Sequence, residues 1–96
     1  MDGGVRSITN ADLAAGCERV VVIAPVVVAM RRSTRIDVQL ARLGPGVRSI
    51  VVSPDRAARK AIGRQVLSPE RRPAAARAGR AQAALVAARV REVLTP

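Results

Sequence analysis

An acidic residue followed by two glycines, Asp2-Gly3-Gly4, opens the stretch of sequence in which chemistry is easiest to see. A carboxylate next to a hydroxyl nucleophile can accept its proton and later pass it to a leaving alcohol. Glycine lets a loop turn sharply without side-chain clashes. The tripeptide therefore predicts a tight turn that presents Asp2 as a general base, although simple turn formation would explain the same glycines.

A base needs a nucleophile, and the chain offers no obvious one. Hydrolases that activate serine commonly place it in a Gly-x-Ser-x-Gly elbow, and no serine of this chain has that spacing; the five are Ser7, Ser33, Ser49, Ser53 and Ser68. Cys17 has no histidine to form its thiolate, because the chain contains none. We interpret Cys17 as a small buried residue and assign no nucleophile to this chain.

Composition limits what 96 residues can build. The length allows one small domain or part of a larger one. The hydrophobic residues make up 49% of the chain but include no aromatic residue, so the core is expected to be thin. One cysteine and no histidine exclude a disulfide framework and most zinc sites. We expect no metal and no cofactor.

The charge is strongly positive, at +10 from 17 basic and 7 acidic residues. Such an excess attracts polyanions, but Lys60 is the only lysine, and an arginine bias of this kind also arises from a GC-rich coding sequence. Without aromatic residues for base stacking, a nucleic-acid surface would depend on phosphate contacts alone. The composition therefore argues against a nucleic-acid partner. A small basic protein that binds nucleic acid or an anionic membrane is kept as the alternative interpretation.

The longest apolar run, Val20 to Met30, is too short to span a bilayer and is interrupted by Pro25. The sequence after Met1 does not have the pattern of a secretory signal. We expect a cytoplasmic protein, and association with a membrane surface stays open.

The first half of the chain predicts a short helix, a strand, a helix and a second strand. Thr9 or Asn10 can cap a helix over residues 10–15 that Gly16 ends. In residues 19–24, Arg19 is followed by a continuous apolar run that is mostly β-branched, which is typical of a parallel strand covered on both faces. A helix is predicted to begin at Ser33 or Thr34, because Ile36, Leu40 and Leu43 have helical spacing. Gly44-Pro45-Gly46 ends this helix, and a strand over residues 47–52 follows.

The second half predicts two helices with similar starts. Ser53-Pro54-Asp55 has a hydroxyl cap, a first-turn proline and an acid, and leads into a helix over residues 57–62 closed by Gly63. Ser68-Pro69-Glu70 repeats the start. From Pro73 onward the pattern separates an apolar side, formed by Leu85, Val86, Val90, Val93 and Leu94, from an arginine side with Arg77, Arg80 and Arg91.

Alternating strands and helices predict the α/β class with a parallel sheet. Two strands alone are only marginally stable in water. We therefore expect residues 1–96 to be part of a three-layer α/β domain whose N-terminal strands lie upstream.

Five segments, in this order, resemble the C-terminal part of bacterial patatin-like phospholipases: Asp2 to Ser7, Thr9 to Gly16, Val20 to Pro25, Val51 to Asp55, and Ala78 to Ala81. The resemblance implies a serine acyl hydrolase with a Ser–Asp dyad, acting on a lipid or other fatty acyl ester. Asp2 would be the proton acceptor and Gly3 and Gly4 would complete its motif. The family's glycine-rich oxyanion loop and its serine elbow precede this motif and are not among these residues, so the chain alone is predicted to be inactive.

Three hypotheses follow. The chain is the C-terminal part of a patatin-like hydrolase, or a small basic binding protein, or a non-catalytic piece that completes the fold of a separately encoded N-terminal half.

Overall fold

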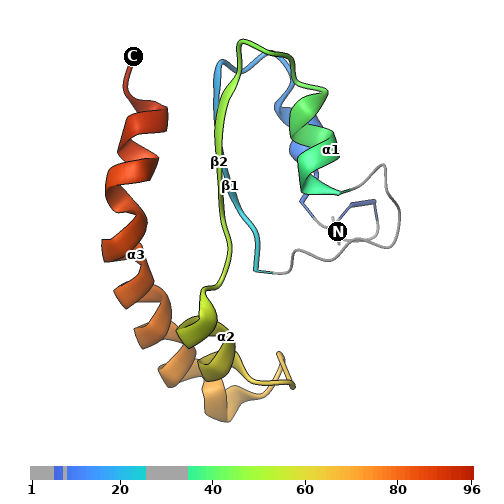
Figure 1. Cartoon of the computed structure of the whole chain (residues 1–96). Helices are drawn as coiled ribbons and strands as arrows, with labels where there is room; N and C mark the ends of the chain where they lie inside the picture. The colour runs from blue at the N-terminus through green and yellow to red at the C-terminus, as the bar shows by residue number, and fades with distance from the viewer. Residues whose placement is uncertain (1–5, 8, 26–34) are drawn as a thin grey trace. The chain divides into compact units, whose positions relative to one another are not determined.

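The computed structural model describes residues 6, 7, 9–25 and 35–96. They form, in order, η2 (Ala11–Ala14), β1 (Arg19–Ile23), α1 (Ile36–Ala41), β2 (Arg48–Val52), α2 (Arg56–Ile62), η4 (Pro69–Arg71) and α3 (Arg72–Leu94) (Figure 1). The predicted α/β class is confirmed. Two compact units share these elements: the described residues up to Ser53 with Arg89–Pro96, and Pro54–Ala88.

In the first unit β1 and β2 pair in parallel, as the sequence predicted. Val20 lies opposite Ser49 and Val22 opposite Val51. The backbone N–H of Ala24 extends the ladder by donating to the carbonyl of Val52 at 2.8 Å. Within the described residues the sheet has these two strands, and the helix between them is the crossover that parallel pairing requires.

The core of this unit lies on one face of β1. Val20, Val22 and Ala24 are buried there with Ala11 of η2, and a ring of partly buried side chains packs around them: Ala14, Ile36, Leu40, Leu43 and Val47. Figure 1 shows η2 and α1 on the same side of the sheet. The predicted helical stripe of Ile36, Leu40 and Leu43 is therefore confirmed as the contact surface of α1.

The prediction that β1 is covered on both faces is wrong for its end, because Ile23 is 76% exposed. Alternate side chains of a strand point to opposite faces. Val20 and Val22 pack against residues of η2 and α1, whereas Ile23 points away from that core. A continuous apolar run identified the strand correctly but could not show which side chains would find a partner.

The ends of the two short helices in the first unit agree only in part with the sequence predictions. Gly16 has a φ of 93° after η2, so the left-handed turn predicted there is confirmed. The predicted side-chain cap of this helix is not observed. Asn10 lies at the N-cap position of η2, but its side chain makes no capping hydrogen bond. It bonds to preceding residues instead. The proposed start of α1 at Ser33 or Thr34 lies outside the described residues, and Arg35 is at its N-cap position.

In the second unit Asp55, not Ser53, caps α2. Its Oδ1 accepts from the backbone N–H of Ala58 at 2.8 Å, and its own N–H donates to Oε1 of Gln82 on α3 at 3.1 Å. Ser53 is two residues too early to reach the free N–H groups of the first turn. Gly63 ends α2 with a φ of 74°, as predicted.

Helix α3 departs in part from its predicted apolar side. Val86, Val90 and Val93 are half-buried, but Leu85 and Leu94 are 75% and 52% exposed. The two leucines lie at the margins of the stripe, where no side chain of the described structure covers most of their surface. The stripe is therefore narrower than the sequence suggested.

The end of α3 is fixed to the start of β2 within the first unit. The guanidinium of Arg48 donates to the carbonyls of Glu92 at 2.5 Å and Thr95 at 3.0 Å. The last carbonyls of a helix have no partner inside the helix, and a cation also interacts favourably with the helix dipole there. Among the described helices, none combines the length and apolar character that a membrane span needs.

Candidate functional site

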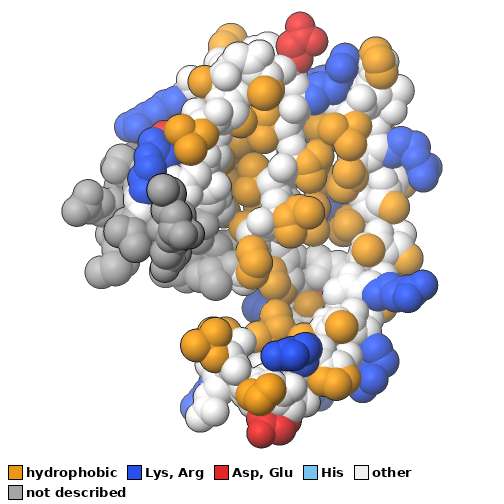
Figure 2. Space-filling model, turned by 180° about the vertical axis from the view of Figure 1, so that it is seen from behind, with side chains coloured by type: hydrophobic (Ala, Val, Ile, Leu, Met, Phe, Trp, Pro, Cys, Tyr) orange, Lys and Arg blue, Asp and Glu red, His pale blue; other side chains and the backbone are white. Residues whose placement is uncertain are grey.

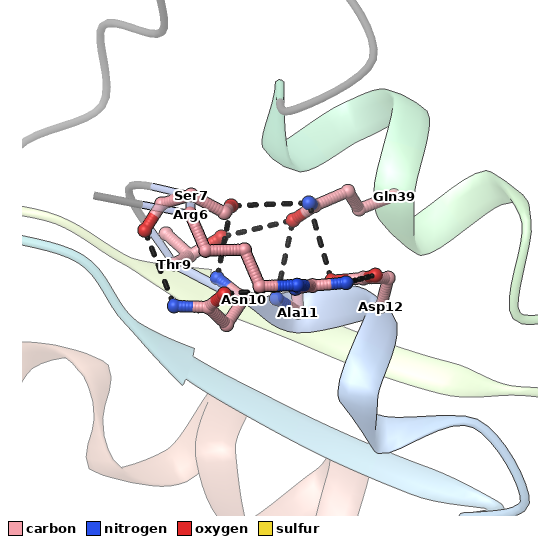
Figure 3. A network of polar contacts seen from close by, with 7 residues as sticks. All are labelled: Arg6, Ser7, Thr9, Asn10, Ala11, Asp12 and Gln39. Atoms are coloured by element: carbon pink, nitrogen blue, oxygen red, sulfur yellow. Dashed lines mark hydrogen bonds and ion pairs between the residues drawn. The ribbon is translucent and has the colours of Figure 1, made fainter. Parts of the chain in front are cut away.

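The predicted site residues Asp2, Gly3 and Gly4 lie outside the described residues. The structure does describe most of the segment that follows them, which runs from Arg6 into η2. Figure 3 shows that this segment meets α1 through a set of polar contacts. We name this set the Gln39 clamp; its members are Arg6, Ser7, Thr9, Asn10, Ala11, Asp12 and Gln39.

Gln39 is the centre of the clamp. Its side chain lies on α1 and the residue is only 3% exposed. Oε1 accepts from the backbone N–H of Ala11 at 3.1 Å and from Oγ1 of Thr9 at 3.2 Å. Nε2 donates to Oγ of Ser7 at 3.1 Å and to Oδ1 of Asp12 at 3.3 Å (Figure 3). These four bonds use both donors and both acceptor positions of the amide.

Ser7 is the second buried polar residue of the clamp, at 4% exposure. Its Oγ also accepts from the backbone N–H of Asn10 at 3.1 Å, and its carbonyl accepts from Nδ2 of Asn10 at 3.2 Å. The hydroxyl thus receives two donated bonds, from a backbone N–H and from the Gln39 amide. Neither donor is a base, so this geometry does not activate Ser7 as a nucleophile.

Arg6 and Asp12 form the outer edge of the clamp. The guanidinium makes a two-pronged contact with the carboxylate, at 2.9 Å to Oδ1 and 2.5 Å to Oδ2, and it also donates to Oδ1 of Asn10 at 2.8 Å. The hydrogen bond from Arg6 lowers the pKa of Asp12, and the same bond raises the pKa of Arg6. A carboxylate held in its charged form in this way is a weak proton acceptor, which argues against Asp12 as a general base.

The clamp therefore has an architectural role. It combines a buried amide, a buried hydroxyl and an ion pair, with no nucleophile next to a base among its bonds. Its bonds to Gln39 hold Ser7, Thr9, Ala11 and Asp12 against α1. Buried polar groups that are fully bonded in this way favour a single arrangement of the chain.

Sequence reasoning missed Gln39, although a signal was present. Ile36, Leu40 and Leu43 define the apolar stripe of α1, and Gln39 falls inside that stripe at three residues after Ile36 and one before Leu40. A lone amide in an apolar stripe indicates a buried polar group that must find partners. The sequence could have suggested the buried amide but not its four partners.

Cys17 is exposed, so its interpretation as a small buried residue is wrong. The left-handed turn at Gly16 and the start of β1 at Arg19 leave Cys17 in the connection between them, outside the core. Ser49 lies on β2, and Ser53 and Ser68 lie in the connections before α2 and η4. Ser33 is outside the described residues. Ser68 donates a hydrogen bond to the carboxylate of Glu70.

Three comparisons with known proteins found no match to the chain. No family model matches it, no curated protein matches it, and no solved structure matches it.

Proposed function

We propose that the chain forms the C-terminal part of a patatin-like serine acyl hydrolase, in which Asp2 accepts the proton of a serine contributed by residues outside these 96. The observation that carries the proposal is the Gln39 clamp. Four bonds of one buried amide anchor Ser7, Thr9, Ala11 and Asp12, which follow Asp2-Gly3-Gly4 in the sequence, to α1. A general base is useful only when its position is fixed, and the clamp fixes described residues that come shortly after Asp2 in the sequence.

The parallel sheet supports the same proposal. β1 and β2 pair with a helix between them, which is the unit from which larger parallel sheets are built. Sheets of this kind are normally larger and covered on both faces, and Ile23 at 76% exposure is a side chain that further elements would cover.

The chemistry would proceed in two steps. The serine hydroxyl would attack the carbonyl carbon of a fatty acyl ester while Asp2 accepts the hydroxyl proton, and that proton would then pass to the departing alcohol. Water would next attack the acyl-serine, with Asp2 accepting the water proton and returning it to the serine oxygen, so that free fatty acid leaves. The elbow serine and the oxyanion donors would both come from the other residues.

The test uses a polypeptide that joins this chain to the coding sequence immediately upstream, if that sequence encodes a Gly-x-Ser-x-Gly elbow in frame. We expect this polypeptide to hydrolyse a p-nitrophenyl fatty acyl ester. Asp2→Asn should lower kcat/KM by at least about 1000-fold, because the proton acceptor is gone. Asp37→Asn, an exposed carboxylate on α1, is the matched control and should retain activity. Absence of an upstream elbow, or full activity of Asp2→Asn, would contradict the proposal. The 96-residue chain alone should hydrolyse nothing.

A further inference from the structure

A second feature lies in the other unit, in the loop between α2 and η4. Residues Gln65–Ser68 form a turn closed by a bond from the N–H of Ser68 to the carbonyl of Gln65 at 3.0 Å. Its two central residues are Val66 and Leu67, which are 67% and 92% exposed. We name this pair the apolar tip. Central turn positions usually carry Gly, Asn, Asp, Ser or Pro, so two neighbouring apolar side chains there require a separate explanation.

The loop that carries the apolar tip is held at both ends. Gly63 ends α2 in a left-handed conformation, and the Arg71 guanidinium lies close to it, 3.3 Å from the place that a Cβ on Gly63 would occupy. On the other side the N–H of Arg71 donates to the carbonyl of Ser68 at 3.3 Å. The side chain of Ser68 also donates to the carboxylate of Glu70. These contacts give the tip a defined base from which Val66 and Leu67 project into solvent.

The unit that carries the apolar tip has an excess of exposed positive charge. Residues 54–88 contain eight basic and two acidic side chains, a net charge of +6, and all eight basic residues are exposed: Arg56, Arg59, Lys60, Arg64, Arg71, Arg72, Arg77 and Arg80. Arg64 directly precedes the turn, and Arg71 and Arg72 follow it within five residues of Leu67. In Figure 2 the Lys and Arg side chains are spread among exposed hydrophobic ones.

We propose that this loop binds an anionic membrane surface, with Val66 and Leu67 inserted among the lipid chains and Arg64, Arg71 and Arg72 at the level of the phosphates. Binding of a protein to a membrane surface combines burial of apolar area with attraction of cations to anionic headgroups, and this loop supplies both. A nucleic acid would engage the arginines but leave the apolar tip in water, and the chain has no aromatic residue to stack on bases. The proposal does not depend on hydrolase activity.

Glu70 limits how far the loop can enter. It lies three residues after Leu67, and the hydrogen bond from Ser68 lowers the pKa of its carboxylate, so Glu70 is charged at neutral pH. A carboxylate is repelled by anionic headgroups and is costly to dehydrate. The loop therefore inserts its Val66 and Leu67 side only.

The first experiment measures co-sedimentation of the whole chain with vesicles of phosphatidylcholine containing about 30 mol % phosphatidylserine, a composition with a negative surface potential. We expect binding to these vesicles and little to pure phosphatidylcholine. The double variant Val66→Ser/Leu67→Ser should lower the partition coefficient by about 10-fold or more, because two apolar side chains no longer enter the membrane. Both residues are exposed, so the folded core loses no contact.

Leu85→Ser is the matched control, because Leu85 is also exposed, at 75%, and belongs to the same unit. It should leave the partition coefficient within about twofold of the unchanged chain, since surface substitutions away from the contact have small effects. Arg64→Gln/Arg72→Gln should weaken binding by about 10-fold or more, at roughly 1 kcal/mol for each arginine near the surface. Added salt should weaken it further.

A second experiment places a reporter at the tip. The chain contains no tryptophan, so the emission of Leu67→Trp comes from the tip alone and should shift to shorter wavelength with anionic vesicles and not with double-stranded DNA. The proposal is overturned if the tip serine variant binds as tightly as the unchanged chain, or if the bound tryptophan keeps its emission in water. It is also overturned if the unchanged chain does not bind the anionic vesicles; loss of self-association in the serine variant would then assign the tip to contact with a second copy.

Discussion

The Gln39 clamp and the apolar tip place polar and apolar groups in opposite ways. In the clamp, Gln39 of α1 and Ser7 of the segment before η2 are buried, and each of these two polar side chains is hydrogen-bonded. In the tip, a short loop keeps its polar contacts at its base and turns Val66 and Leu67 outward. Burying a polar group lowers the stability of the fold unless the group is hydrogen-bonded. An apolar side chain that stays in water adds no hydrophobic stabilisation to the fold. The contrast assigns an internal, positioning role to the clamp and an outward, binding role to the tip.

The strongest way to break this contrast is Gln39→Leu. Leucine keeps the bulk of the side chain but leaves the N–H of Ala11 and the side chains around it without their partner. We expect the free energy of unfolding to fall by about 3 kcal/mol, because unpaired buried polar groups cost about 1–3 kcal/mol each. Urea denaturation followed by circular dichroism measures this change.

Gln65→Leu is the matched control, since Gln65 is an exposed glutamine at the start of the tip turn. It should change the unfolding free energy by no more than about 0.5 kcal/mol. Amide hydrogen exchange adds a local measurement: Gln39→Leu should speed exchange at Ala11 and leave Ala58, in the other unit, unchanged. Equal destabilisation by the two leucine variants would remove the distinction between clamp and surface.

A pair of glycine substitutions sharpens the comparison at the base of the tip. Gly63→Ala places a Cβ at a φ of 74° and 3.3 Å from Arg71, so we expect a loss of about 1 kcal/mol of unfolding free energy. Gly79→Ala lies within α3 where an added Cβ meets nothing within 4 Å, and it should gain about 0.5–1 kcal/mol. Thermal unfolding of both variants tests the opposite signs, and a stabilised Gly63→Ala would mean that the loop has no fixed base.

Sequence reasoning succeeded where a local pattern decides the structure. The apolar run of β1, the helical spacing of α1, and the turns at Gly16 and Gly63 each follow from residues close together in the chain. The class of fold followed from their order. Asp2 and its two glycines, by contrast, were inferred from a motif that the described residues do not include.

The missed features depend on contacts between residues far apart in the sequence. Gln39 meets Ser7 across 32 positions and Ala11 across 28. The exposure of Ile23, Leu85 and Cys17 likewise depends on which elements find each other in space. A local pattern can indicate that a residue needs a partner, but it cannot name that partner.

The two helix starts with similar sequences give a smaller test. Asp55 caps α2 through a 2.8 Å bond, whereas Ser68 stands at the N-cap position of η4 without a capping bond. Asp55→Ala should therefore cost about 1 kcal/mol of unfolding free energy. Ser68→Ala should cost less than about 0.5 kcal/mol, since its hydroxyl contacts only the exposed Glu70. Equal losses in urea denaturation would show that Ser68 is a cap after all.

The smallest expected effect concerns pH and the outer edge of the clamp. Because Arg6 lowers the pKa of Asp12 in the folded chain, the carboxylate contributes stability above its ordinary pKa of about 4. That contribution is lost as the pH falls through the lowered pKa that Asp12 has in the folded chain. Asp12→Asn removes it, so the unfolding free energy should fall less steeply below about pH 4 than in the unchanged chain. Arg6→Gln should flatten this acid limb as well, and the double variant should add little to either, because the hydrogen bond from Arg6 is the largest cause of the lowered pKa of Asp12. Glu70 keeps its own lowered pKa in every variant, so the differences report Asp12. An acid limb that Asp12→Asn leaves unchanged would remove the ion pair from the clamp and leave Gln39 as its main support.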